Sequence, residues 1–209
     1  MIDTAAKATS LDQETRDWIR NPSDVRAAEN GCFFDVLQGS YAVWWIERYC
    51  RLYEGEQAGQ RMYLRGCAQC QNSIDVPDEW DDAAKALYYQ RAVKYSECVK
   101  AGHQTDWQYE CTMRCFGWVR YSEKWRRNIR RFREASIWIA KKNKKSPTLA
   151  AWALYLLIGD GEQGQKVFIA AKDGNQARDI GAKHASEMVR LSPELSEACR
   201  INKVRASIR

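Results

Sequence analysis

Residues 141–146 form a lysine-rich segment whose ammonium and hydroxyl groups could bind phosphate. The segment reads K-K-N-K-K-S and ends in Lys145 and Ser146. These two residues match the end of the phosphate-loop pattern G-x-x-x-x-G-K-S/T, in which the lysine contacts the β and γ phosphates and the hydroxyl ligates magnesium. Both glycines of the pattern are replaced, by Ile139 and Lys144. The pattern alone therefore also fits a solvated, lysine-rich turn.

The segments on either side of this loop predict a βαβ unit. An apolar, β-branched run precedes it at 137–140, a helical pattern follows it, and 167–171 reads as a second buried strand. Such strands are parallel, with a right-handed crossover and helices on both faces. A loop between a parallel strand and its helix binds phosphate through free backbone N–H groups and the positive helix end. The predicted inward face of the helix consists of Leu149, Trp152, Ala153, Leu156 and Leu157.

Four further stretches of the sequence, outside the loop, are distinctive in combination with it. They read P-T-L-A-A-W-A-L-Y-L-L, G-D-G-E-Q-G-Q-K-V-F-I-A-A-K-D-G-N-Q-A, S-E-M-V-R-L-S-P-E-L-S-E and, near the start, D-W-I-R-N-P-S-D-V-R-A-A-E-N-G-C-F-F-D. Together with the loop they resemble the ATPase domain of the large terminase subunit of tailed bacteriophages, which often carries R-K-N-G-K-S. The likeness covers most of the chain except about 61–104. Lys141 stands where that family usually has Arg, and Lys144 where it usually has Gly.

The resemblance implies an α/β fold with a partial P-loop NTPase parallel sheet (βαβα), preceded by an N-terminal mostly helical region. Residues 1–104 would be the helical lead-in, with an inserted arm near 61–104, and 105–209 the P-loop ATPase core. No apolar run after Ser146 ends in Asp-Glu. The acidic strand and the nuclease domain of the family are therefore expected beyond this chain, which resembles a truncated N-terminal part.

The resemblance also implies a site for ATP and Mg²⁺. Gln108 would read adenine, because one side-chain amide can accept from N6–H and donate to N7. The alternative is an ordinary exposed glutamine on a helix. Lys145 and Lys141 would act in catalysis, Lys141 in the sensing role of the usual arginine, and Ser146 would ligate magnesium. The implied nucleotide-binding residues are Gln108, Lys141, Lys142, Asn143, Lys144, Lys145 and Ser146.

The function implied by the resemblance is ATP-driven packaging of double-stranded DNA into a phage capsid. The implied partners are the DNA, the small terminase subunit, the portal and further copies of the chain in a homo-oligomeric motor. This chain alone is expected to bind ATP without hydrolysing it. The alternative function is a non-catalytic nucleic-acid-binding or assembly module with a degenerate P-loop.

The charge distribution is compatible with a polyanionic partner. The formal net charge is +6, and residues 124–133 form the most basic run, K-W-R-R-N-I-R-R-F-R. Arginines in 126–133, among them Arg130, Arg131 and Arg133, would contact phosphates through sequence-independent counterion release. The alternatives are a solvated helix or loop, or arginines that face a neighbouring subunit's nucleotide.

Composition also indicates the compartment. The longest apolar stretch, 149–158, is about half of the ~20 residues that cross a bilayer, and no signal peptide is apparent. We expect a soluble protein of the bacterial cytoplasm with no membrane contact. The eight cysteines are then expected to be reduced thiols rather than disulfides.

One cysteine pair has metal-ligand spacing. Cys67 and Cys70 are separated like half of a zinc site, which needs two more ligands. The candidates are Cys98 with His103 or Cys111 with Cys115, and neither pair repeats the C-x-x-C spacing.

Three helices are predicted before the loop. Asn21-Pro22-Ser23-Asp24 has the composition of a helix start. In residues 41–52 the aromatic side chains recur at nearly helical spacing, which predicts an amphipathic helix with a buried aromatic face. Residues 77–99 are acidic at the start and basic later, an order that favours a helix through its dipole.

Overall fold

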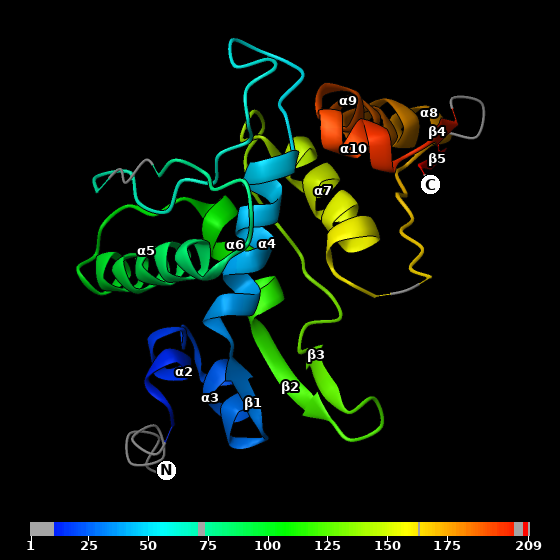
Figure 1. The fold of residues 1–209 in the computed structure, drawn as a ribbon. Helices are drawn as coiled ribbons and strands as arrows, with labels where there is room; N and C mark the ends of the chain where they lie inside the picture. Colours follow the sequence, from blue (N-terminus) through cyan, green and yellow to red (C-terminus); the bar gives the residue numbers. More distant parts are fainter. Residues whose placement is uncertain (1–10, 71–73, 163, 203–206, 209) are drawn as a thin grey trace. The chain divides into compact units, whose positions relative to one another are not determined.

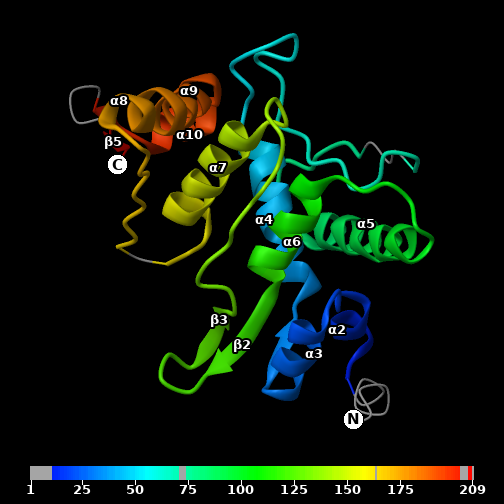
Figure 2. The same ribbon diagram turned by 180° about the vertical axis from the view of Figure 1, so that it is seen from behind.

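The computed structural model describes residues 11–70, 74–162, 164–202 and 207–208. The chain divides into two compact units, each made of segments distant in sequence. The first comprises Met1–Val43 and Leu64–Ser136, and the second Trp44–Tyr63 and Ile137–Arg209. Helices and strands occur in both units (Figures 1 and 2), which confirms the α/β class.

The helices of the first unit begin at polar capping residues. Asn21 accepts hydrogen bonds from the N–H groups of Ser23 and Asp24, and Asp81 and Asp106 cap two further helices in the same way. The predicted helix start at Asn21 is therefore confirmed. The helices are α2 Gln13–Asp17, α3 Pro22–Glu29, α5 Asp82–Lys100 and α6 Trp107–Gly117, and α4 Val36–Tyr49 begins in this unit and ends in the second.

A three-stranded antiparallel sheet completes the first unit. Its order is β1 (Cys32–Phe34), β2 (Trp118–Ser122), β3 (Arg127–Arg130), with Phe34 paired to Trp118 and Arg120 to Ile129. Because β1 and β2 are far apart in sequence, their pairing joins the start of the chain to the segment after α6. Residues 124–126 of the basic run lie in the turn between β2 and β3, residues 127–130 form β3, and 131–133 follow as a loop, so the run is not helical.

The core of the first unit is aromatic. The ring of Trp18 stacks on Phe34 at 4.3 Å between centroids and on Tyr95 at 5.7 Å, and Trp118 meets Phe34 edge-on. Such contacts add to the apolar area that each ring buries. A Cβ at Gly117 would lie 2.7 Å from Phe34, so this position requires glycine.

The second unit is mostly helical. The indole of Trp45, on α4, contacts Tyr155 and covers Gly159, where an added Cβ would lie 2.6 Å from the ring. Its elements are α7 Lys145–Leu154, the π-helix Tyr155–Gly159, α8 Gly174–Gln176, the π-helix Ala177–Ala182, α9 Lys183–Leu191, α10 Pro193–Ala198, and the antiparallel strands β4 Ile201–Asn202 and β5 Ser207–Ile208.

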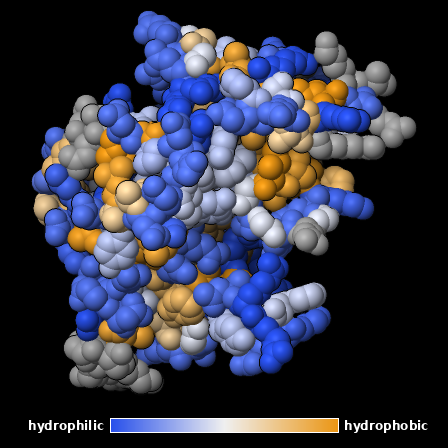
Figure 3. Space-filling view, viewed as in Figure 1, coloured by the Kyte–Doolittle hydropathy of each residue, from blue (hydrophilic) through white to orange (hydrophobic). Residues whose placement is uncertain are grey.

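The predicted helix after the loop is confirmed as α7 and its π-helical extension, but its inward face is partly wrong. Trp152 is buried as predicted, whereas Leu149 is 51% exposed. Thr148, Ala151 and Tyr155 are buried instead, which shifts the inward stripe by one residue. In a helix that is apolar almost all round, periodicity defines the face poorly. Hydrophobic residues are visible at the surface over α7 (Figure 3).

The parallel sheet predicted from the sequence is not formed by the described residues. Segments 137–140 and 167–171 have no regular secondary structure and belong to no strand. Trp138 is 94% and Phe168 85% exposed, whereas strands of a parallel sheet are buried on both faces. An apolar, β-branched composition indicates that a segment can be buried, but the strand also needs a neighbour to pair with its backbone.

The other two predicted helices are confirmed. Residues 41–52 lie largely in α4, with Trp44 and Trp45 buried, and 77–99 corresponds to α5. Across the described ranges, none of the helices combines the length and apolarity needed to cross a bilayer.

Candidate functional site

The lysine-rich loop leads directly into a helix N-terminus, as the sequence predicts. Residues 141–144 form the turn, and Lys145 and Ser146 are the first two residues of α7. The first backbone N–H groups of a helix have no acceptor within it. Pro147 lacks an N–H but occupies the first turn, where that group would have no helical partner. The amides of Lys145 and Ser146 are thus oriented like the donors of an anion site.

Two lysines of the loop adopt left-handed backbone geometry. Lys144, at the position of the second glycine in the phosphate-loop pattern, has φ 52° and ψ 30°, and Lys142 has φ 67°. The carbonyl of Lys144 accepts hydrogen bonds from the N–H and the hydroxyl of Thr148, at 3.2 and 2.8 Å. Position 144 therefore has the geometry for which glycine is suited, and a side chain there costs about 1–2 kcal/mol.

The loop is closed by its own polar groups. The Lys145 ammonium donates to the carbonyl of Ile139 at 2.7 Å, which joins the two ends of the loop. The Asn143 amide lies 3.4 Å from the Ala140 carbonyl. A lysine ammonium bonded to a neutral carbonyl gains a stronger bond, in which both partners are charged, when a phosphate oxygen replaces that carbonyl.

A contact that sequence reasoning missed holds the middle of the loop. The Lys144 ammonium donates to the Oε1 atom of Gln57 at 3.0 Å. Gln57 lies in the 44–63 segment of the same unit, and no local motif marks it. Lys141 and Lys142 are exposed at the loop surface.

The predicted adenine-binding residue, Gln108, lies in the other unit. It occupies the first turn of α6, its N–H donates to Asp106, and its carbonyl accepts from the Thr112 hydroxyl. Its side chain is buried, so the alternative of an exposed helical glutamine is wrong. The structure thus places six of the seven predicted site residues in one loop, and the pairing of Gln108 with that loop stays a prediction.

The comparison with protein families decides what this loop belongs to. The model of the terminase large subunit ATPase domain matches residues 106–208, about half of the chain. Residues 106–208 belong to the terminase large subunit ATPase family. Comparisons with curated proteins and with solved structures give no significant match. The terminase ATPase segment runs from the start of α6 to β5 and includes both the basic hairpin and the lysine-rich loop.

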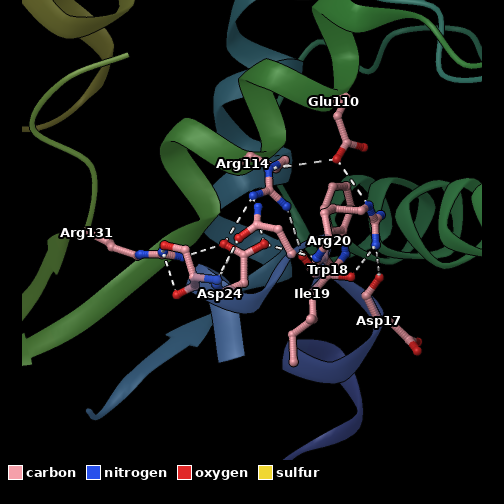
Figure 4. Close-up of polar contacts among 10 residues, drawn as sticks. Asp17, Trp18, Ile19, Arg20, Asp24, Glu110, Arg114 and Arg131 are labelled. Atoms are coloured by element: carbon pink, nitrogen blue, oxygen red, sulfur yellow. Dashed lines mark hydrogen bonds and ion pairs between the residues drawn. The ribbon is translucent and has the colours of Figure 1, made fainter. Parts of the chain in front are cut away.

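The basic hairpin of the terminase ATPase segment does not present all of its arginines to solvent. Lys124, Trp125 and Arg126 lie at the exposed turn between β2 and β3, with the Lys124 ammonium 4.9 Å from the Trp125 ring. Arg131 instead donates to the Asp24 carboxylate at 2.7 Å and to Ser23 (Figure 4). The expectation that Arg131 contacts DNA is thus corrected, because a buried carboxylate holds this guanidinium.

A pair of substitutions at position 144 tests the backbone strain in the loop. Lys144→Gly and Lys144→Ala both remove the contact with Gln57, but only glycine relieves the left-handed geometry. We expect Lys144→Gly to be more stable than Lys144→Ala by about 1 kcal/mol, since the cost of the side chain is partly offset by the unfolded-state entropy of glycine. Denaturant unfolding of both variants measures the difference. Equal stabilities would show that the backbone at 144 is not strained.

Proposed function

We propose that this chain carries the nucleotide-binding part of a terminase motor that packages phage DNA. The observation that carries the proposal is the coincidence of the family match with the position of Lys145 and Ser146. Both residues lie at the start of α7, behind a loop whose backbone is left-handed where the phosphate-loop pattern has glycine. In this proposal the catalytic core comprises residues 105–209.

In this proposal Lys145, Ser146, Lys141 and Gln108 have the roles that the phosphate-loop pattern and the family resemblance imply. Lys145 exchanges the Ile139 carbonyl for the β and γ phosphates of ATP, and the backbone amides of Lys145 and Ser146 donate to the same oxygens. Lys141 takes the position of the usual arginine and senses the γ phosphate. Gln108 recognises adenine, the role that the family resemblance implies for it.

The magnesium-binding set in this loop is incomplete. The Ser146 hydroxyl fits a magnesium ligand at this place of the phosphate-loop pattern. Magnesium is normally held by one or two carboxylates together with phosphate oxygens and water. The parallel sheet whose acidic strand provides such a carboxylate is not formed by the described residues. We therefore expect the chain to bind ATP without turnover.

The two segments that the sequence predicts as strands support a larger sheet in the working motor. Residues 137–140 and 167–171 have strand-like composition and expose Trp138 and Phe168 almost fully. Aromatic side chains of this size usually bury most of their surface. In this proposal both segments become strands of the predicted parallel sheet in the working ATPase.

Thermal unfolding with different nucleotides tests the proposed site. Mg-ATP at about 100 times its Kd should stabilise the protein by about 2.7 kcal/mol. Mg-AMP should have little effect, because it lacks the β and γ phosphates that Lys145 would contact. Phosphate release should stay at background level. Equal shifts with both nucleotides would contradict the role of the loop, and turnover that requires Lys145 would contradict binding without hydrolysis.

A second candidate function, a nucleic-acid-binding module, is favoured by the exposed turn of the basic hairpin. Cations next to an exposed aromatic ring suit phosphate contact with base stacking. Lys124→Gln with Arg126→Gln should lower the slope of log K against log salt by roughly 0.9 for each lost phosphate contact with duplex DNA. Filter binding over a range of salt concentrations measures that slope.

The matched control for the hairpin removes the same charge elsewhere. Lys166 and Lys172 are exposed in the second unit, and Lys166→Gln with Lys172→Gln should leave the salt slope unchanged. If both double variants reduce the slope equally, the DNA responds to net charge rather than to the hairpin.

A further inference from the structure

Four metal-ligating side chains converge in the first unit, away from the lysine-rich loop in sequence. They are Cys67, Cys70, Cys98 and His103, and their ligand atoms all lie within 4.8 Å of one another. The Nδ1 atom of His103 lies 3.8 Å from the Cys67 sulfur and 3.5 Å from the Cys70 sulfur. Tetrahedral zinc with Zn–S near 2.3 Å and Zn–N near 2.0–2.1 Å separates such ligand atoms by roughly 3.5–3.8 Å.

Local backbone geometry delivers the second pair of ligands. Cys98 lies in the last turn of α5, and His103 follows three residues after its end. Gly102 has φ 72°, its N–H donates to the Val99 carbonyl, and the His103 N–H donates to the Cys98 carbonyl. This pair of bonds is the Schellman ending of a helix, which needs glycine at the left-handed position. It turns the chain back so that His103 faces Cys98.

The first pair is held by a turn that already binds its own sulfur. The backbone N–H of Cys70 donates to the Cys67 sulfur at 3.4 Å. Hydrogen bonds to a ligating group orient it toward the metal. The same turn is tied to the entrance of α6, since the Ala68 N–H donates to the Gln104 carbonyl and the Asp106 N–H to the Gly66 carbonyl.

The geometry points to a structural zinc site formed by Cys67, Cys70, Cys98 and His103. Three cysteine sulfurs and one imidazole nitrogen form a closed ligand set of the type that structural zinc prefers, and soft thiolates disfavour magnesium or calcium. The cysteines are not joined in disulfides. Of the two ligand pairs left open by the sequence, the structure selects Cys98 with His103.

Zinc at this site would fix the start of the terminase ATPase segment. Its ligands join the 67–70 turn to the end of α5 and to His103, three residues before Asp106, which caps α6 by accepting from the Gln108 N–H. Removing the metal should therefore increase amide hydrogen exchange in 66–70 and 101–108. The site would act on folding and would not depend on nucleotide binding.

Metal analysis of the purified full chain tests this proposal. We expect about one zinc per chain, with binding lost in Cys70→Ser and in His103→Ala. Cys111→Ser and Cys115→Ser are matched controls, because they remove the alternative ligand pair and should keep the zinc. Circular dichroism checks that each variant is folded.

Two measurements on the unmodified chain avoid variants that fail to fold. Blocking the thiols with an organomercurial should release zinc to a coloured chelator, and cobalt(II) added after zinc removal should give the absorption bands of a tetrahedral thiolate site. Absence of zinc together with absence of these cobalt bands would overturn the proposal. A Cys67–Cys70 disulfide in freshly purified protein, or loss of zinc in the Cys111→Ser and Cys115→Ser controls, would do the same.

Discussion

An Asp24→Asn variant is expected to lose about 3–5 kcal/mol of unfolding free energy, because it removes the buried carboxylate that pairs with the largely buried side chains of Arg114 and Arg131. Asp24 is 1% exposed. Its carboxylate accepts from Arg114 at 2.9 and 3.1 Å, from Arg131 at 2.7 Å and from the backbone N–H of Arg20 at 3.0 Å (Figure 4). These bonds connect α3, α6 and the end of the hairpin within the first unit.

Denaturant unfolding of Asp24→Asn measures this loss, and Asp17→Asn provides the control. The Asp17 carboxylate pairs with Lys100, whose side chain is mostly exposed. Pairs of this kind contribute at most about 1 kcal/mol. If both variants lost the same amount, the buried cluster around Asp24 would have no special role in stability.

The same cluster should make stability depend on acidity. Burial by itself raises the pKa of Asp24, but the Arg20 backbone N–H, Arg131 and Arg114 outweigh burial and hold this pKa below its usual value. A depressed pKa in the folded state means that the contribution is complete above the unfolded pKa, near 3.9, and is lost as pH falls through the folded value. Acid unfolding should thus be steeper in wild type than in Asp24→Asn.

Local signals in the sequence predicted the helices well. Asn21 followed by Pro22 marks a helix start, and capping depends on residues within one turn. The left-handed backbone at Lys144 coincides with the position at which the phosphate-loop pattern has glycine.

Non-local pairing accounts for most of what the sequence did not reveal. The partner of β2 is β1, which is far earlier in the chain, and Arg131 binds Asp24 across a similar separation. Neither pairing leaves a periodic pattern in either segment alone. The segments 137–140 and 167–171 show the opposite case. Their strand-like composition is recognisable in the sequence, but the sequence does not reveal whether a neighbouring strand pairs with them.

Lys145→Ala is expected to weaken ATP binding about tenfold or more. The substitution removes a charge-assisted contact with phosphate worth about 1.5–3 kcal/mol. In the free protein it removes the bond to the Ile139 carbonyl, which lies within the loop itself, so the fold should survive. Lys142→Ala is the matched control, because Lys142 belongs to the same loop, shares the left-handed geometry and is exposed.

Calorimetric titration of Mg-ATP into wild type, Lys145→Ala and Lys142→Ala tests the nucleotide-binding role most directly. We predict binding by wild type, an affinity at least about tenfold lower in Lys145→Ala, and a nearly unchanged affinity in Lys142→Ala. Lys144→Gly should not bind more tightly than wild type, because it relieves strain but removes a cation near the phosphates. Absence of wild-type binding at millimolar Mg-ATP, or equal affinities in all three proteins, would contradict a phosphate-binding function for this loop.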